Sequence, residues 1–271
     1  MTASLRLQLD GGVAVLTLAE PATRNALSEA MLQALADALA RIEADACARC
    51  VVIAAEGPAF CAGHDLKAFQ AHRGERDYYA GIFTRCAEVM TRIVRLPQPV
   101  IAAVEGVATA AGCQLVAACD LAVAGAAARF ATPGVNIGLF CSTPAVALTR
   151  AVGPKAAMRM LLTGEMIDAA TALSMGLVSM VTSEGDALDK AMTWARSIAE
   201  KPAHVVQEGK AAVRAQRDLD LDQAYALASG VMIEHMLDPA SGEGIAAFLQ
   251  KRKPDWRQAL KACAADPSGP G

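Results

Sequence analysis

The chain carries Phe60-Cys61-Ala62-Gly63-His64-Asp65-Leu66-Lys67 and, further on, Thr109-Ala110-Ala111-Gly112-Cys113-Gln114, two small-residue segments that decide its fold. Each segment follows a short apolar run, at 51–55 and at 100–104, and each leads into a helical pattern. Strands that alternate with helices in this way predict an α/β core. Two such loops side by side would aim free backbone N–H groups at one carbonyl oxygen and form an oxyanion hole. The glycines would also be explained if they only permitted tight turns from strand to helix.

Outward from these segments, the chain shows further regular patterns. Alternating leucines at 5–9, a turn at Asp10-Gly11-Gly12 and an apolar run at 13–18 predict a β-hairpin. Ser28 is placed to cap a helix whose apolar residues share one face. Helical patterns follow at 76–96, 143–151, 154–163 and 167–175, and the chain reads as helical from about residue 187 onward.

The composition excludes several classes of protein. Of 271 residues, 54% are hydrophobic and 20% charged, which argues against a disordered chain. The net charge of -3 gives no basic excess, so nucleic acid is not an expected partner. No apolar run is long enough to span a membrane, and the N-terminus lacks the apolar core of a signal peptide. We therefore expect a cytoplasmic protein that has no membrane partner.

The eight cysteines are expected to be reduced thiols, because the predicted compartment is reducing. Cys47 and Cys50 form a single CxxC pair without a second pair, so no metal site is predicted. Both residues are more simply explained as flanking the end of a helix and the start of a strand.

Seven motifs that follow one another along the chain resemble the enoyl-CoA hydratase/isomerase (crotonase) family. They are Asn25-Ala26-Leu27-Ser28, the 60–67 segment, Gly106 followed by 110–120, 130–138, Leu162-Thr163-Gly164, Gly176-Leu177-Val178 and 247–254. Within that family, the segments 108–114 and 130–144 are most similar to the enoyl-CoA-hydratase-domain-containing proteins of animal mitochondria and their bacterial relatives.

The resemblance implies an α/β fold of the crotonase type, a spiral of ββα units shared with the ClpP proteases. It implies a core over 1–200 that binds acyl-CoA, and a C-terminal helical region over 201–271 that builds a homotrimer or a dimer of trimers. The implied partner is an acyl-CoA thioester, with coenzyme A as part of the substrate and no separate cofactor. The implied setting is fatty acid metabolism.

The resemblance also assigns roles to individual positions. The two oxyanion donors would be the backbone N–H groups of His64 and Ala111. The residues that contact coenzyme A would be Arg24, Ala26, Ala62, Asp65, Leu66 and Lys67, together with Phe248 and Lys251 reaching a neighbouring subunit's ligand. The basic run at 251–253 is also explained as a helix end favoured by the helix dipole.

Both carboxylates that the hydratases use are missing from the matching positions. Gln114 replaces the first glutamate, and Gly134 occupies the second position after Pro133. A glutamine side chain holds a water molecule by hydrogen bonds but does not accept its proton near neutral pH. Losing one general acid or base costs on the order of 10²–10⁴ in rate, so hydration is expected to be weak or altered.

Ser142 is the remaining candidate for a catalytic side chain, as a nucleophile or as a group that positions water. It is also explained as the N-cap of the helix near Pro144 or as a pocket-lining residue. The sequence therefore leaves open an acyl-CoA enzyme with weak hydratase, isomerase or thioesterase activity and a non-catalytic acyl-CoA-binding protein. We see no Ser/His/Asp set that would indicate a ClpP-like protease.

Overall fold

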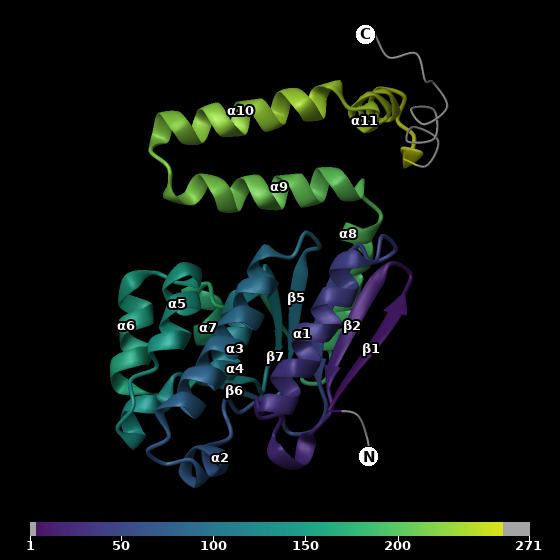
Figure 1. The fold of residues 1–271 in the computed structure, drawn as a ribbon. Helices are drawn as coiled ribbons and strands as arrows, with labels where there is room; N and C mark the ends of the chain where they lie inside the picture. Colours follow the sequence, from purple (N-terminus) through teal and green to yellow (C-terminus); the bar gives the residue numbers. More distant parts are fainter. Residues whose placement is uncertain (1–3, 257–271) are drawn as a thin grey trace. The chain divides into compact units, whose positions relative to one another are not determined.

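A computed structural model describes residues 4–256 and divides the chain into two compact units, residues 1–198 and 199–271 (Figure 1). Each unit is described by itself. Within residues 4–256, no helix is both long and apolar enough to cross a bilayer.

The first unit is built on a six-stranded sheet. Its strands lie in the order β1-β2-β3-β5-β7-β10. Their bounds are β1 (Leu5–Asp10), β2 (Val13–Leu18), β3 (Cys50–Ala55), β5 (Val100–Val104), β7 (Leu121–Gly125) and β10 (Met180–Thr182). The predicted hairpin is present, because β1 pairs antiparallel with β2, whereas the remaining neighbours are parallel. Strands β3 and β5 are almost fully buried, as expected for parallel strands covered on both faces.

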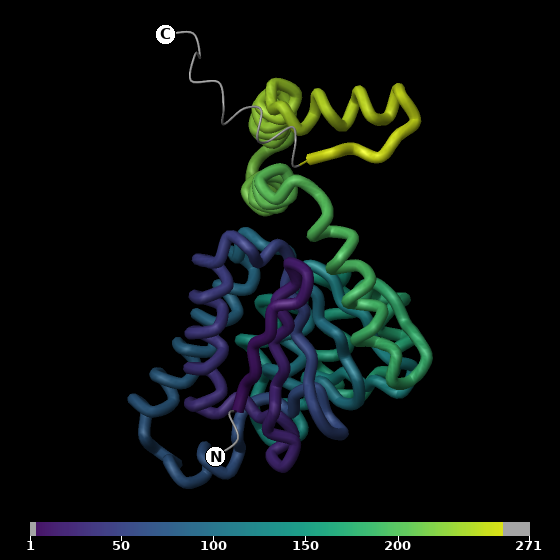
Figure 2. Tube along the Cα trace, turned by 90° about the vertical axis from the view of Figure 1, so that its right-hand side faces the viewer, coloured from purple at the N-terminus to yellow at the C-terminus, as the bar shows by residue number. Residues whose placement is uncertain are grey.

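Helices cover this sheet from both sides. In Figure 2, α1 (Glu29–Ala44) lies on one side of the β1–β2 hairpin and α8 (Ala187–Ala199) on the other. Helix α3 (Arg76–Arg95) lies beside α1. The predicted N-cap of α1 is confirmed, since the Ser28 hydroxyl accepts a hydrogen bond from the Met31 amide at 3.2 Å.

A second sheet of four very short strands was missed in the sequence. It contains β4 (Ala59–Cys61), β6 (Val107–Thr109), β8 (Arg129–Ala131) and β9 (Ile167–Asp168) in that order. The pairs β3–β4, β5–β6 and β7–β8 each give one strand to each sheet, and a helix follows each pair, as in the predicted spiral of ββα units. Strands of two or three residues show no alternation of their own, so only their pairing partners define them.

The helices that follow the strands lie close to their predicted positions. Helix α4 (Ala111–Ala118) follows β6, and α2 (Leu66–Ala71) follows β4. The helices predicted at 143–151, 154–163 and 167–175 are α5 (Ser142–Ala151), α6 (Pro154–Thr163) and α7 (Ala169–Met175), and the first two residues of the last range belong to β9 instead. Strand β10 begins only at Met180, because the chain first turns through Gly176 at a φ of 82°.

The second unit consists of helices. It contains α9 (Ala203–Ala215), a 3-10 helix η3 (Gln216–Asp218), α10 (Leu221–Leu237) and α11 (Pro239–Leu249). Helices α9 and α10 run antiparallel side by side (Figure 1). Two histidine–carboxylate hydrogen bonds lie between them, from His204 to Asp238, directly after α10, at 2.9 Å and from His235 to Glu208 at 3.0 Å.

Candidate functional site

The two small-residue loops lie directly against each other. A methyl group added to Gly112 would stand 2.1 Å from the carbonyl oxygen of Cys61. A Cβ on Gly63 would stand 3.2 Å from the amide nitrogen of Ala111. The Thr109 hydroxyl donates a hydrogen bond of 3.1 Å to the Ala62 carbonyl. The glycines are therefore required by the close approach of the two loops, and the φ of +86° at Gly63 adds a turn that favours glycine.

The amides of His64 and Ala111 are not used by the fold. Ala111 is the first residue of α4, where an N–H group has no intrahelical acceptor. Neither amide donates a hydrogen bond to another described residue of the chain. Ala110, the residue directly before α4, has a φ of 51° and a ψ of −117°. This conformation is strained for a residue other than glycine. Its own amide is held by the Ala131 carbonyl at 2.9 Å.

The ring of His64 is packed among aromatic side chains. It stacks on Phe69 at 5.4 Å and meets Phe83 edge-on at the same distance. Burial lowers the pKa of His64, so the ring is neutral near pH 7. Its Nδ1 lies 3.3 Å from the Leu27 carbonyl oxygen, which accepts only, so this nitrogen carries the proton. The Nε2 atom then presents a lone pair, which has no partner among the described residues.

The two positions where the hydratases carry a glutamate, Gln114 and Gly134, differ in the space available for a side chain. Gln114 is 4% exposed on α4, and its Oε1 atom has no hydrogen-bond partner among the described residues. Gly134 is buried in the 3-10 helix η2 (Pro133–Ile137). A Cβ at Gly134 would stand 2.6 Å from the Leu139 carbonyl oxygen and 2.8 Å from the Cys141 sulfur. The present backbone therefore cannot accept a glutamate at position 134.

Ser142 is exposed and is the first residue of α5, so its interpretation as the N-cap is wrong. The N-cap position is held by Cys141, whose side chain makes no capping hydrogen bond. The Ser142 hydroxyl lies 3.4 Å from the Phe140 carbonyl instead.

The thiols around the loops are weak nucleophiles. Burial raises the pKa of both Cys61 and Cys113 to about 12. Burial also raises the pKa of Cys141, against the opposing effect of a hydrogen bond from the Gly134 amide. Within the described residues, no group of three or more His, Cys, Asp or Glu side chains could hold a metal ion.

The segment before α1 is tied to the first loop. The Ala62 amide donates to the Arg24 carbonyl at 3.0 Å, and the Leu27 amide donates to the Gly63 carbonyl at 2.8 Å. Buried Asn25 anchors this segment through its side chain, which accepts from the Glu20 amide and donates to the Glu56 and Ala59 carbonyls. The structure thus brings Arg24, Ala26 and Ala62 to one loop.

The remaining predicted coenzyme A contacts fall into two groups. The Asp65 carboxylate caps α2 by accepting from the amides of Lys67 and Ala68, and exposed Leu66 and Lys67 form the first turn of that helix. Phe248 and Lys251 belong to the second unit, which is described by itself. Their role as coenzyme A contacts stays a prediction.

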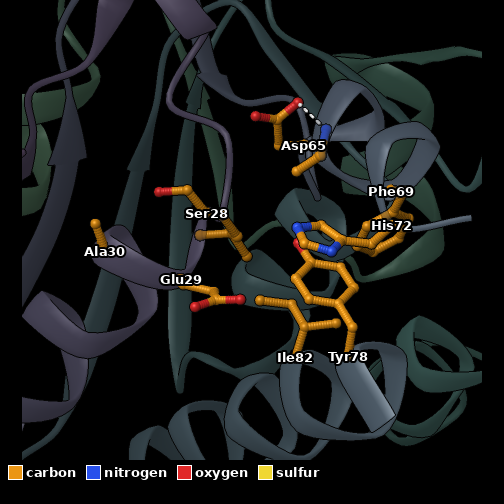
Figure 3. Close-up of a pocket in the computed structure, with 10 residues that line it drawn as sticks. Ser28, Glu29, Ala30, Asp65, Phe69, His72, Tyr78 and Ile82 are labelled. Atoms are coloured by element: carbon orange, nitrogen blue, oxygen red, sulfur yellow. Dashed lines mark hydrogen bonds between the residues drawn. The ribbon is translucent and has the colours of Figure 1, made fainter. Parts of the chain in front are cut away.

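A pocket of about 340 Å³ opens beside the first loop, between the start of α1, helix α2 and the start of α3 (Figure 3). Ser28 and Glu29 line one side, and His72 and Tyr78, stacked at 3.9 Å, line the other. The sequence analysis missed this pocket. A signal was present, since a chain with only 4% aromatic residues places four aromatic rings between 69 and 83.

Comparisons with known proteins agree with this fold. The family model described as enoyl-CoA hydratase/isomerase matches residues 8–259. The human enoyl-CoA hydratase domain-containing protein 3, a mitochondrial protein, is 49% identical over 92% of this chain and 82% of its own length. A solved enoyl-CoA hydratase from Mycobacterium smegmatis has a TM-score of 0.90 and 51% identity, over 94% of this chain and 99% of that one. The 2,3-dehydroadipyl-CoA hydratase of Escherichia coli is 35% identical over 90% of this chain and 95% of its own.

The fold defines a crotonase-type spiral with two apposed small-residue loops. The chain belongs to the enoyl-CoA hydratase/isomerase family, whose members act on acyl-CoA thioesters and are typically oligomeric.

The expectation of a cytoplasmic protein is contradicted, because relatives nearly half identical to this chain are mitochondrial proteins. That expectation rested on the lack of an apolar N-terminal segment. Such a segment marks secretion, whereas mitochondrial targeting uses amphipathic, arginine-rich peptides. The observation was therefore unable to distinguish cytoplasm from mitochondrion.

Proposed function

We propose that this protein binds an acyl-CoA thioester and holds the thioester carbonyl oxygen between the backbone amides of His64 and Ala111. The observation that carries the proposal is the close contact of the two loops at Gly63 and Gly112, beside two amides that no other described residue uses. Fixed amide donors of this kind stabilise negative charge that develops on a carbonyl oxygen. Family membership supports the thioester as the ligand class.

The proposed chemistry is weak or altered hydration of an enoyl thioester in acyl-CoA metabolism. Gln114 holds water without taking its proton, and the tight packing around Gly134 leaves no space for a second carboxylate. Each missing acid or base costs on the order of 10²–10⁴ in rate. The same observation favours a second candidate, a non-catalytic acyl-CoA-binding protein. Isomerisation or thioester hydrolysis would need another group to move the proton, and Ser142 is a poor choice because it is exposed.

The proposed coenzyme A contacts follow the first loop. Arg24, Ala26 and Ala62 lie along the segment that is hydrogen-bonded to it. Asp65 would contact the ligand through its backbone, because its carboxylate is occupied in capping α2. Lys67 is exposed and offers a point charge to a phosphate group. We assign Leu66 a packing contact on the same turn, and treat coenzyme A as part of the substrate with no separate cofactor.

We also propose a homo-oligomer, either a trimer or a dimer of trimers. The support comes from apolar side chains on the second unit that the chain itself leaves in solvent. Leu221, Leu237 and Phe248 are 72%, 76% and 82% exposed. Large exposed apolar surfaces mark interfaces. In such an assembly, Phe248 and Lys251 would reach a neighbouring subunit's coenzyme A, and light scattering after size-exclusion chromatography would give the number of subunits.

The proposal is tested by removing one amide donor. Proline is tolerated at the first position of a helix and has no N–H group, so Ala111→Pro deletes the donor. Titration calorimetry should show acetyl-CoA affinity reduced roughly 10-fold, as expected for a lost hydrogen bond in a dry site. The affinity for free coenzyme A, which has no thioester carbonyl, should be unchanged. Ala203→Pro, at the first position of α9, is the matched control.

Two results would overturn this assignment. The first is an Ala111→Pro variant that keeps wild-type affinity for acetyl-CoA, or whose affinity for free coenzyme A falls as much as its affinity for acetyl-CoA. The second result concerns the hydration reaction, whose rate is measured from the absorbance of crotonyl-CoA. Rapid hydration that survives Gln114→Ala would show that another group supplies the acid and base.

A further inference from the structure

The pocket beside the first loop is a cavity distinct from the proposed thioester site. Ten residues line it, and they come from the start of α1, from α2 and its N-cap, and from the first half of α3. Neither His64 nor Ala111 is among them. Its volume of about 340 Å³ falls in the usual range of small-molecule sites.

Aromatic and aliphatic side chains form much of the pocket wall. The rings of His72 and Tyr78 stack with their centroids 3.9 Å apart, and Phe69 meets Tyr78 edge-on at 6.4 Å. Leu27 and Ile82, both buried, add aliphatic surface. Tyr78 is half-buried, and its hydroxyl group makes no hydrogen bond with a described residue. The wall therefore offers an apolar surface with one unused phenolic group.

Two acidic side chains also line the pocket. Glu29 extends toward Tyr78 (Figure 3), and its carboxylate forms no ion pair or hydrogen bond within residues 4–256. Asp65 accepts from the amides of Lys67 and Ala68 through Oδ1 alone, so its Oδ2 atom accepts from no described residue. No lysine or arginine is among the lining residues.

The electrostatic balance of this pocket is negative. The positive ends of α1 and α2 border it, and each is equivalent to about half a unit charge at most. Two carboxylates therefore leave a net charge of about −1. The Nδ1 atom of His72 is hydrogen-bonded to the Glu75 carboxylate at 3.0 Å, so this ring is matched by an acid of its own. Burial and then the charges of Glu29 and Asp65 raise the pKa of Tyr78, so the field of both carboxylates reaches that hydroxyl.

These walls select an organic cation with an apolar body. An anion would be repelled by two carboxylates, and a neutral apolar ligand would remove water from them without giving them a partner. A cation is attracted both by the carboxylates and by the electron-rich faces of aromatic rings. An ammonium group also donates the hydrogen bonds that carboxylate oxygens accept.

We propose that this pocket binds a small alkylammonium cation, whose charged group lies at the Glu29 carboxylate and whose alkyl chain packs on Tyr78 and Ile82. The site is independent of the proposed function, because neither amide assigned to the thioester lines it. Helix α2 has no buried residue of its own. A ligand that contacts α1, α2 and α3 together would therefore stabilise α2.

The test compares butylammonium with 1-butanol, which has the same alkyl chain without the charge. Saturation-transfer NMR is carried out at pH 8, above the usual titration range of histidine, and at constant ionic strength. The wild type should bind butylammonium with a Kd of roughly 1–10 mM, as expected for about five non-hydrogen atoms. Its affinity for 1-butanol should be at least about 5-fold weaker.

Two substitutions test the two parts of the wall. Glu29→Gln keeps the size of the side chain and removes its charge, so it should weaken butylammonium binding roughly 3–10-fold and leave 1-butanol unchanged. Glu184→Gln, which removes the same charge from an exposed residue outside the pocket, is the matched control. Tyr78→Leu should weaken butylammonium binding roughly 2–5-fold, whereas Tyr78→Phe, which keeps the ring, should retain most of the affinity.

Several outcomes would overturn the cation site. They are equal wild-type affinities for butylammonium and 1-butanol, an affinity that Glu29→Gln leaves unchanged, and equal losses in Glu29→Gln and Glu184→Gln. Absence of butylammonium binding at about 50 mM, well above the expected Kd, would also overturn it. None of these outcomes changes the expected binding of acetyl-CoA, so a failure here is distinguishable from a failure of the proposed function.

Discussion

Gly112 is the residue whose replacement tests the contact between the two loops most directly. It is the second residue of α4, and a methyl group there would meet the backbone of Cys61 in β4. The added Cβ would stand 2.1 Å from the carbonyl oxygen and 2.8 Å from the carbonyl carbon. No side-chain rotation relieves this contact, because both partners are main-chain atoms. Gly112→Ala therefore has to push strand and helix apart.

The size of the effect follows from that distance. Ordinary van der Waals contact begins near 3.4 Å, so the two elements must separate by about 1.3 Å. Overpacking of this kind costs about 1–3 kcal/mol of the free energy of unfolding. The proposed donor on Ala111 belongs to α4, and the one on His64 lies in the loop that directly follows β4, so a separation of the two elements would move the donors apart. A displacement of roughly 1 Å at a positioned group costs on the order of 10²-fold in activity.

Urea unfolding and titration with acetyl-CoA measure the two consequences of Gly112→Ala separately. The matched control is Gly81→Ala in α3, where an added Cβ meets nothing within 4 Å. That control should gain about 0.5–1 kcal/mol, because alanine is the better helix residue, and should keep its ligand affinity. A Gly112→Ala protein that unfolds at the wild-type midpoint and binds acetyl-CoA normally would refute the loop contact and the reasoning built on it.

Four further predictions concern single groups. Asn25→Ala should lower the free energy of unfolding by about 2–4 kcal/mol in urea titrations, because this buried side chain makes three hydrogen bonds, one fully buried and two partly buried, that are lost. Gly134→Glu should be destabilised and should not raise crotonyl-CoA hydration, since its Cβ meets the Leu139 carbonyl; a stable and active variant contradicts the packing. The pKa of His64 is lowered on folding, so its contribution to stability is present above about pH 6.5 and is lost as the pH falls; urea midpoints at pH 7.5 and 5.5 should differ less in His64→Phe. Dithionitrobenzoate at pH 8 should label exposed Cys47 well before Cys61 or Cys113, whose pKa values are raised to about 12, and peptide mass spectrometry of the labelled protein checks the order.

Much of the first unit was predictable because its long elements repeat a local pattern. The hairpin of β1 and β2 follows from alternation and a glycine turn, and α1 follows from Ser28 and one apolar face. The second sheet was not predictable in this way. Strands such as β6 and β9 have three and two residues, and they exist only because a distant segment supplies their hydrogen-bond partners.

The features of the candidate site also divide into those that the sequence shows and those that only the folded structure shows. The missing carboxylates at Gln114 and Gly134 are visible in the sequence, since residue identity alone determines which groups can carry a proton. The reason that Gly134 has no side chain is visible only in the packed structure, where the Leu139 carbonyl and Cys141 occupy the space. The pocket between α1, α2 and α3 was overlooked, because its lining residues come from three elements and no local pattern shows that they share a cavity.

The sequence by itself determined the α/β class, the order of the long elements, the two small-residue loops and the absence of acidic groups from the hydratase positions. These properties are local, because they depend on periodicity, on turn chemistry and on the chemical nature of single side chains. Only the tertiary structure decided that Gly63 and Gly112 press the loops together, that Ser142 faces solvent and that Glu29 and Tyr78 line one pocket. Such facts depend on contacts between segments far apart in the chain, and no local pattern records which atoms a folded neighbour will satisfy.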